Sequence, residues 1–270
     1  MISHRFLTHE SIIQFIPPID REQHLLFYTY LTQHKERAQF FGQFEGQRLT
    51  AVLAYLQGMS FPAFSFYCMN PGDVSLPELI AFTREAVQLE TNASCGTILS
   101  SSDLQLFQSH GFITGTPKRF LTMKHVDESK LPEANRAEIV KEAEFAEVID
   151  FFRKSEMQYF TRNELEHSPF LGIKEGGEFI AAGGFHFYNP QLVDLGNIVT
   201  RPDYRGKGLA KLLTRQLTYL GKQMSTDVYL DVFADNLPAV HVYESLGYQT
   251  VAELTMVNFT LTLPKVVRLG

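Results

Sequence analysis

The spacing of apolar residues along the second half of the chain changes several times between a helical and a strand-like pattern. Residues 138–152 carry apolar side chains at helical spacing, which predicts an amphipathic helix. Apolar runs at 170–173, 179–188 and 192–200 predict strands, because half-buried strands are short and rich in such residues. This part of the chain is therefore expected to form one helix followed by several strands.

A leucine stripe follows. Leucines recur every three or four positions after Gly208, which predicts a helix with one apolar face that ends at Gly221. Alternation over 228–233 predicts a buried strand, a short helix is expected over 238–246, and a last strand over 251–263. Helices and strands in this order are typical of an α/β layer around a mixed sheet.

A polar, proline-containing segment at 125–137 separates the two halves and predicts a linker. The chain has 270 residues, which favours two domains over one. We therefore predict a first domain over residues 1–125, a linker over 126–137 and a second domain over 138–270.

Composition narrows the possible partners. Asp and Glu outnumber Lys and Arg, 30 to 24, so the formal net charge is −6. This balance argues against nucleic acid and against an anionic membrane, and it favours cationic partners. The amino terminus lacks the continuous apolar core of a signal peptide, and no run approaches the length of a membrane span. Two unpatterned cysteines indicate neither a disulfide framework nor a zinc site, and we expect a cytoplasmic protein.

The most informative segment is a glycine-rich loop between a predicted strand and the leucine helix. Gly206 and Gly208 allow the backbone to approach a ligand closely, and the first N–H groups of the helix lack intrahelical partners. Such a corner suits phosphate. Lys207 is followed by Gly208, not by Ser or Thr, and no Gly-x-Gly-x-x-Gly run occurs, so neither a P-loop nor a Rossmann site fits.

Two motifs occur on either side of the leucine helix. The first is Arg205-Gly206-Lys207-Gly208-Leu209-Ala210, and the second spans residues 236–248, from Asn236 to Tyr248. They resemble the Arg/Gln-x-x-Gly-x-Gly/Ala pyrophosphate loop and the Asn-x-x-Ala-x-x-x-Tyr-x-x-x-Gly-Phe/Tyr segment of the GNAT superfamily of acyl-CoA-dependent N-acyltransferases. Both occur in order, with one helix and one strand between them, and the resemblance covers roughly residues 138–263.

The resemblance implies acetyl-CoA as cosubstrate and no metal, since the histidines are scattered without ligand spacing. The residues implied in cofactor binding are Ile198, Val199 and Thr200 of the strand, Arg205, Gly206, Lys207, Gly208, Leu209, Ala210 and Lys211 of the loop, and Asn236. The strand residues would act through their backbone groups, unless they form an ordinary buried strand. Asn236 would bond the cofactor or a nearby backbone, or simply cap a helix.

Tyr243 corresponds to the family's general acid, which would protonate the departing CoA thiolate; the alternative is a core tyrosine. The attacking amine must also lose a proton, so a base is required. Asp231, His186 and Asp194 are the candidates, and we favour Asp231, which lies where some family members carry a glutamate.

The first half resembles the second at an offset of about 136 residues, counted from Phe107 to Tyr243. A helix over 77–89 and a strand over 96–100 then match their counterparts in the second half. The loop at 70–75 lacks the arginine and the paired glycines, and Asp73 would repel a phosphate. We therefore expect a degenerate GNAT-like domain that helps to shape the acceptor cleft, in a tandem arrangement similar to mycothiol synthase-like acyltransferases.

The implied fold is α/β (α+β), with two tandem GNAT-like domains, each a mixed, mostly antiparallel central sheet flanked by helices. The implied function is transfer of an acetyl group from acetyl-CoA to a primary amine by direct attack. A small amine, an amino acid or a peptide N-terminus would serve as acceptor, and the acidic balance favours a small, cationic one. A homodimer is compatible with these features. The alternative function is that of a non-catalytic acyl-CoA sensor, against which the intact Tyr243 argues.

Overall fold

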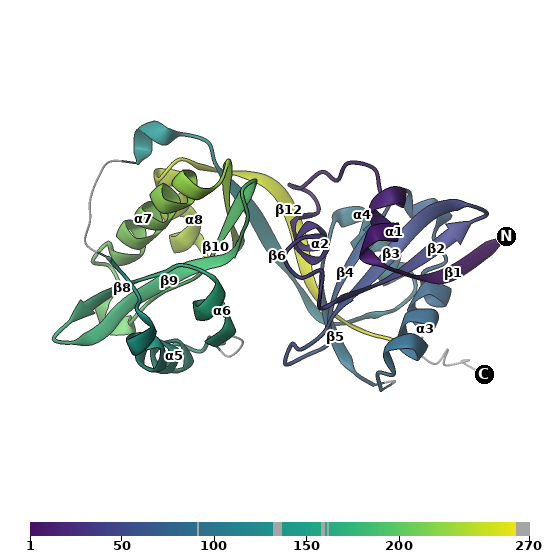
Figure 1. Cartoon of the computed structure of the whole chain (residues 1–270), viewed down its shortest axis with the longest axis horizontal. Helices are drawn as coiled ribbons and strands as arrows, with labels where there is room; N and C mark the ends of the chain where they lie inside the picture. The colour runs from purple at the N-terminus through teal and green to yellow at the C-terminus, as the bar shows by residue number, and fades with distance from the viewer. Residues whose placement is uncertain (91, 132–136, 158–159, 161, 263–270) are drawn as a thin grey trace. The chain divides into compact units, whose positions relative to one another are not determined.

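The computed structural model of the chain describes residues 1–90, 92–131, 137–157, 160 and 162–262. The chain divides into two compact units. The first comprises Met1–Phe120 together with the residues from Glu253 on, and the second comprises Leu121–Ala252. Figure 1 shows a sheet with helices packed around it in each unit.

The first unit is built on a sheet with strand order β1-β2-β3-β4-β5-β12. Its neighbouring strands are antiparallel except for β4 and β5, which are parallel. Its elements are β1 (Ile2–Leu7), α1 (His9–Phe15), α2 (Leu25–Leu31), β2 (Ala38–Glu45), β3 (Arg48–Leu56), β4 (Ala63–Cys68), the 3-10 helix η1 (Pro71–Asp73), α3 (Leu76–Val87), β5 (Ser94–Leu99), α4 (Ser101–Ser109) and the start of β6 (Ile113–His125).

The second unit is built on a sheet with strand order β6-β11-β10-β9-β8-β7. Strands β7, β8, β9 and β10 pair in this order, each antiparallel to the next, whereas β10 and β11 are parallel. Its elements after β6 are η2 (Glu128–Lys130), β7 (Glu138–Ile139), η3 (Glu142–Glu144), α5 (Phe145–Lys154), α6 (Arg162–His167), β8 (Phe170–Glu175), β9 (Glu178–Tyr188), β10 (Leu192–Thr200), η4 (Pro202–Tyr204), α7 (Leu209–Met224), β11 (Asp227–Phe233), α8 (Leu237–Ser245) and β12 (Tyr248–Thr260).

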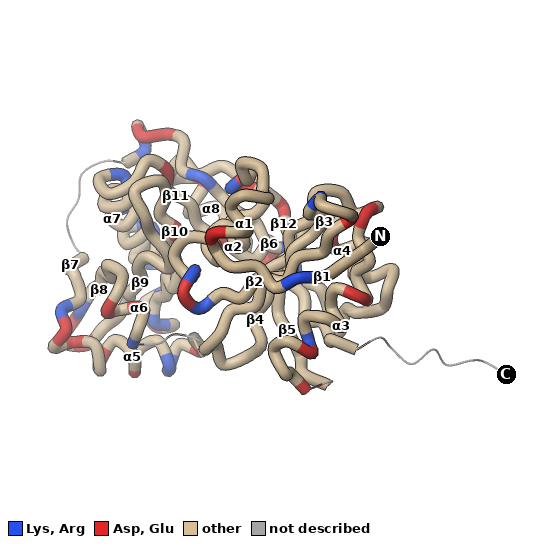
Figure 2. Tube along the Cα trace, turned by 45° about the vertical axis from the view of Figure 1, so that its right-hand side comes forward, with Lys and Arg blue, Asp and Glu red and all other residues tan. Residues whose placement is uncertain are grey.

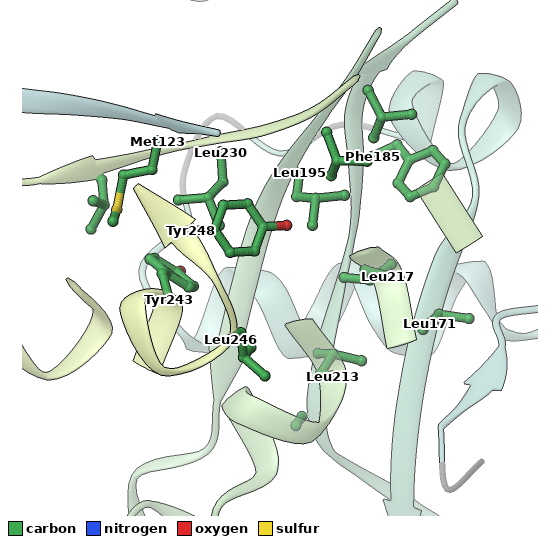
Figure 3. Close-up of a cluster of buried hydrophobic side chains, with 14 of the residues drawn as sticks. Met123, Leu171, Phe185, Leu195, Leu213, Leu217, Leu230, Tyr243, Leu246 and Tyr248 are labelled. Carbon is green, nitrogen blue, oxygen red and sulfur yellow. The ribbon is translucent and has the colours of Figure 1, made fainter. Parts of the chain in front are cut away.

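The predicted leucine stripe forms the core on one face of this second sheet. Leu213 and Leu217 of α7 are fully buried and lie in one apolar cluster with Leu195 of β10 and Phe185 of β9, as Figure 3 shows. Helices α5 and α6 pack on the opposite face, in a separate cluster around Phe152 and other aromatic side chains. The predicted fold class, a mixed sheet flanked by helices in two tandem domains, is confirmed.

Three predicted boundaries were wrong. The helix expected over 138–152 begins only at Phe145, because Glu138 and Ile139 pair with β8 as a short strand. Gly221 does not end α7, which continues to Met224. Gly221 instead lies at a close packing contact, where an added Cβ would come 3.1 Å from the Val228 side chain. The last strand begins at residue 248, three residues earlier than expected.

The division of the chain also differs from the predicted domain boundaries. Strand β12 begins in the second unit, but residues 255–260 pair with β5 of the first unit. Val257 and Phe259 are buried in the same cluster as Phe107. The chain therefore returns to the first unit at its end, because the long β12 supplies the strand that completes that unit's core. Part of the predicted linker, 132–136, lies outside the described residues.

Charged residues of both signs are interspersed along both units (Figure 2). The formal net charge of −6 is thus spread along the chain. Of the helices that the structure describes, none has the length and apolar character needed to span a bilayer.

Candidate functional site

The predicted glycine-rich loop leads directly into the amino terminus of α7. Gly206 and Gly208 both adopt a φ of 76°, a left-handed conformation that favours glycine. A Cβ at either position would meet nothing within 4 Å, so the space beside the loop is open. Gly208 is the N-cap of α7 and supplies no side-chain hydrogen bond, so the first N–H groups of this helix are available to an anion.

Basic side chains surround this loop, and some of them are already engaged. Arg201 pairs with Asp203 at 2.8 Å and with Glu178 at 3.0 Å. The guanidinium of Arg205 donates to the carbonyl of Thr200 at 3.3 Å, which fixes its position at the end of β10. Other predicted residues of the loop, Lys207 and Lys211, are exposed.

Strand β10 loses β11 as a partner just before this loop. The pairing of the two strands covers residues 192–195 and 227–230, and both strands continue beyond it. Past this point β10 contains a bulge, with Asn197 at a φ of 55°, and residues 196–200 are half-buried. The strand residues expected to present backbone groups, Ile198, Val199 and Thr200, therefore lie where β10 and β11 have separated.

Tyr243 lies on α8 with its side chain in the core of the second unit. The residue is 9% exposed, and its ring centroid is 6.1 Å from that of Tyr248. Figure 3 shows the two side chains in the same cluster. Its phenol makes no hydrogen bond to another described residue, whereas the hydroxyl of Tyr248 is 2.6 Å from that of Thr218. Burial raises the pKa of Tyr243 to about 12, so this phenol is neutral at physiological pH and can donate a hydrogen bond.

Asn236 is the N-cap of α8, with its side-chain oxygen accepting from the backbone N–H of Ala239 at 3.4 Å. The structure thus gives Asn236 the capping role that was the alternative to cofactor binding. No contact between Asn236 and a cofactor follows from this geometry.

The three candidate bases, from three neighbouring strands, interact electrostatically. Asp231 of β11 accepts a hydrogen bond from Thr122 of β6 at 2.7 Å, and desolvation raises its pKa to about 6. Asp194 of β10 is 6% exposed, and its Oδ1 is buried without a described partner. Desolvation and the charge of Asp231 raise the pKa of Asp194 well above its usual value. His186 of β9 interacts electrostatically with both carboxylates.

Glu164 was missed by the sequence analysis. It lies on the short helix α6, and its carboxylate accepts a hydrogen bond from Asn197 at 2.8 Å and lies 3.4 Å from Nδ1 of His186. No motif or spacing marks Glu164, because the contact joins residues more than 20 positions apart. Among the residues that the structure describes, no group of three or more His, Cys, Asp or Glu side chains is arranged to hold a metal ion.

The corresponding place in the first unit has a different structure. Residues 71–73 form a 3-10 turn, and Asp73 pairs with Arg48 at 3.0 Å. Parallel pairing of β4 with β5 is confined to one residue pair, but α2 packs against β4, with the ring of Phe27 stacked 5.0 Å from that of Tyr67. Protein side chains thus line β4, and no glycine-rich loop opens into α3.

Separated parallel strands, an open glycine loop and a helix that starts at it give the second unit a place where an anionic ligand such as a pyrophosphate could bind. Residues 136–248 match the profile of the acetyltransferase (GNAT) family. This match covers the part of the chain that carries both motifs, so this region is similar to the GNAT family, as the motifs had indicated.

Two curated relatives are similar to part of the chain. Mycothiol acetyltransferase of Corynebacterium glutamicum is 38% identical over 90 residues, which are 32% of this chain and 30% of that protein. N-alpha-acetyltransferase RimI of Mycobacterium tuberculosis is 30% identical over 88 residues, 32% of this chain and 54% of the relative. The chain thus spans about a third to a half of the length of these two relatives.

A solved structure is similar over nearly the whole chain. A tandem GNAT protein from the clavulanic acid biosynthesis pathway aligns with a TM-score of 0.65 at 13% identity, covering 97% of this chain and 99% of that one. At this identity the likeness concerns the fold alone, and it agrees with two GNAT-like units in one chain.

Proposed function

We propose that this protein is an N-acetyltransferase that transfers an acetyl group from acetyl-CoA to a primary amine. The observation that carries the proposal is the open glycine loop at the start of α7, next to the stretch of β10 that has separated from β11. Free helix N–H groups favour a pyrophosphate, and an unpaired strand edge favours an extended pantetheine arm. The names of both relatives specify acetyl transfer, and one of them specifies N-alpha transfer.

The loop and the strand would bind and orient the cosubstrate. Backbone N–H groups from Gly206 to Lys211 would hold the pyrophosphate, with the side chains of Lys207 and Lys211 balancing its charge. Backbone groups of Ile198 to Thr200 would bind the pantetheine arm and the acyl carbonyl. The cosubstrate supplies an activated acetyl thioester, whose C–S bond breaks as the amine nitrogen forms an amide.

Asp231 would accept the proton of the attacking ammonium. Its pKa of about 6 leaves the carboxylate ionised at neutral pH, yet closer to the pKa of a useful base than an exposed aspartate would be. A carboxylate here also favours a cationic acceptor. The amine is therefore proposed to arrive protonated and to lose its proton only within the site.

Tyr243 would stabilise the departing thiolate. A phenol with a pKa of about 12 is a weaker acid than a thiol, whose usual pKa is about 8.5, so full proton transfer to the thiolate is uphill. A hydrogen bond from the neutral phenol to the sulfur remains favourable as negative charge develops in the transition state. We therefore propose that Tyr243 acts by donating a hydrogen bond and that the proton finally comes from water or from the protonated base.

The acceptor, the location in the cell and the assembly of the protein are proposed from its sequence. On the basis of the acidic net charge we propose a small cationic amine as acceptor and no nucleic-acid or membrane partner. A cytoplasmic location is proposed from the two unpatterned cysteines and the composition of the amino terminus. Assembly as a homodimer also remains a proposal.

A panel of amines tests the function. Thiol release from acetyl-CoA would be followed with small amines, diamines, amino acids and peptides that have free amino termini. Amine-dependent thiol release with an acetylated product in the mass spectrum would support the proposal. Tight binding of acetyl-CoA in calorimetry without turnover of any amine would contradict it and favour an acyl-CoA sensor.

A further inference from the structure

The carboxylate of Glu164 joins three elements of the second unit through one oxygen. Oε2 accepts a hydrogen bond from Nδ2 of Asn197 on β10 at 2.8 Å and lies 3.4 Å from Nδ1 of His186 on β9. Glu164 itself comes from α6, and its side chain is only 18% exposed. Water therefore competes weakly for this carboxylate, and the two contacts fix α6 to the sheet.

Asn197 occupies a backbone conformation that needs such support. Its φ of 55° is left-handed, and it lies in the bulge between the paired positions Gly196 and Val199. Non-glycine residues adopt this conformation at some cost, which asparagine tolerates best. The bulge is tightly packed, since a Cβ at Gly183 would come 3.1 Å from Cα of Ile198. The bulge sets the direction of residues 198–200.

We propose that Glu164 is a positioning residue of the acyltransferase site, which holds the β10 bulge through Asn197 and fixes the imidazole of His186. The inference rests on the proposed function, because the bulge directs the backbone groups assigned to the acyl arm. Glu164 touches no reacting atom in this scheme. It acts through its two neighbours.

The contact between Glu164 and His186 also affects the charge of the imidazole. Glu164 from α6 contacts His186, and Asp194 from β10 and Asp231 from β11 act on it electrostatically. Desolvation lowers the pKa of this imidazole, but the three carboxylates outweigh it and raise the pKa to about 9. The positive imidazolium in turn favours the ionised form of Asp231. Removal of the charge of Glu164 should therefore make His186 easier to deprotonate.

Three variants separate the two roles. Glu164→Gln keeps a carbonyl oxygen for Asn197 but removes the charge beside His186. Glu164→Ala removes both. Glu166→Gln is the matched control, because Glu166 lies on the same helix, is 45% exposed and pairs with Arg162 at 2.7 Å.

Three measurements on the wild type and on each variant of the whole chain test the role of Glu164. The first is the NMR titration of the His186 ring, assigned by its loss in His186→Gln. The second is the calorimetric affinity for acetyl-CoA, and the third is the pH profile of kcat/KM with the best amine of the panel.

Glu164→Gln should lower the titration midpoint of His186 by about one pH unit or more, since a carboxylate this close shifts a pKa by roughly that much. Since His186 is still protonated at pH 6 after such a shift, the acidic limb of kcat/KM should stay near pH 6, and acetyl-CoA affinity should stay near that of the wild type. Glu164→Ala should also weaken acetyl-CoA binding about tenfold, the effect of losing one hydrogen bond of about 1.4 kcal/mol. Glu166→Gln should change none of the three.

An unchanged His186 titration in Glu164→Gln would overturn the electrostatic role. Wild-type affinity for acetyl-CoA in Glu164→Ala would overturn the role at the bulge. If the wild type acetylates no amine, the proposed function fails, while the titration and the calorimetry still decide the role of Glu164. If Glu164→Ala does not fold, the bulge is tested by Asn197→Gly, which tolerates the left-handed backbone and should weaken acetyl-CoA binding as well.

Discussion

At the scale of single residues, Tyr243 and Tyr248 form an informative pair. Their rings are neighbours in one core, but only Tyr248 has a described hydrogen-bond partner, Thr218. Tyr243→Phe should leave the free energy of unfolding nearly unchanged, because no intramolecular hydrogen bond is lost. The change should reduce kcat by about 10²–10³-fold if the phenol stabilises the leaving thiolate by a hydrogen bond, with little effect on acetyl-CoA affinity.

Tyr248→Phe provides the control for this prediction. It should reduce stability by about 0.5–1.5 kcal/mol, because one buried hydrogen bond is lost while the hydroxyl of Thr218 still donates to the carbonyl of Thr214 at 2.7 Å, and it should affect kcat far less than Tyr243→Phe. Denaturant unfolding and steady-state kinetics on both variants give the comparison. A Tyr243→Phe enzyme with wild-type kcat, under conditions where chemistry limits the rate, would assign this tyrosine to the core alone.

The raised pKa of Asp231 predicts how kcat/KM depends on pH. Its pKa of about 6 predicts an acidic limb of kcat/KM with a midpoint near pH 6, and Asp231→Asn should lose about 10²–10⁴-fold in activity. Asp235→Asn, at an exposed position just after the same strand, should keep both the limb and the rate. A limb that persists near pH 6 in Asp231→Asn would give the role of base to Asp194, because the pKa of His186 is about 9.

The same carboxyl also predicts the sign of a stability change. A folded-state pKa raised from 3.8 to about 6 means that the folded protein binds the proton more tightly than the unfolded chain. The contribution of this group to stability is therefore full below about pH 4 and is lost as the pH rises through 6. Asp231→Asn should flatten this part of the stability profile, measured by denaturant unfolding between pH 4 and 8.

At the scale of elements, the start of α7 should carry cosubstrate binding. Gly206→Glu and Gly208→Glu should abolish acetyl-CoA binding in calorimetry, through charge repulsion from the phosphates and loss of the open space. Gly206→Ala is the control, because it strains the left-handed backbone at this position without adding a negative charge. It should cost about 1–2 kcal/mol of stability for its left-handed backbone, while retaining measurable binding.

Gly72→Glu places the same charge at the corresponding turn of the first unit. Its φ is not left-handed, and an added Cβ would meet only the Asn70 side chain, at 3.6 Å or more. This variant should bind one acetyl-CoA per chain, as the wild type should. Two binding events per wild-type chain, or loss of binding in Gly72→Glu, would show that the first unit also takes the cosubstrate.

At the scale of the whole molecule, strand β6 determines where the chain can be cut. Leu121 and Met123 of β6 are buried in the core of the second unit, and Thr122 bonds Asp231. A fragment that starts at residue 131 lacks all three and should be strongly destabilised, since loss of each buried aliphatic side chain costs about 2–5 kcal/mol. A fragment that starts at residue 113 keeps β6 and should melt at a clearly higher temperature. Equal melting temperatures would contradict this role of β6.

The sequence by itself determined the local features of this protein. The leucine stripe predicted α7 because helix burial follows the 3.6-residue period, and the alternation at 228–233 predicted β11. The glycines at 206 and 208 marked the left-handed loop because few other residues adopt that backbone conformation at low cost. These signals lie within short windows of sequence, where a residue's preference is decided by its near neighbours.

Only the tertiary structure decided the features that depend on distant partners. The end of β12 belongs to the first unit because its residues pair with β5, about 160 positions away, and no local pattern records that choice. Glu138 and Ile139 form a strand because β8 is beside them. The contact of Glu164 with Asn197 depends on the packing of α6 against the sheet. Such contacts follow from strand register and helix packing, which are set by the whole core and not by the residues that happen to meet.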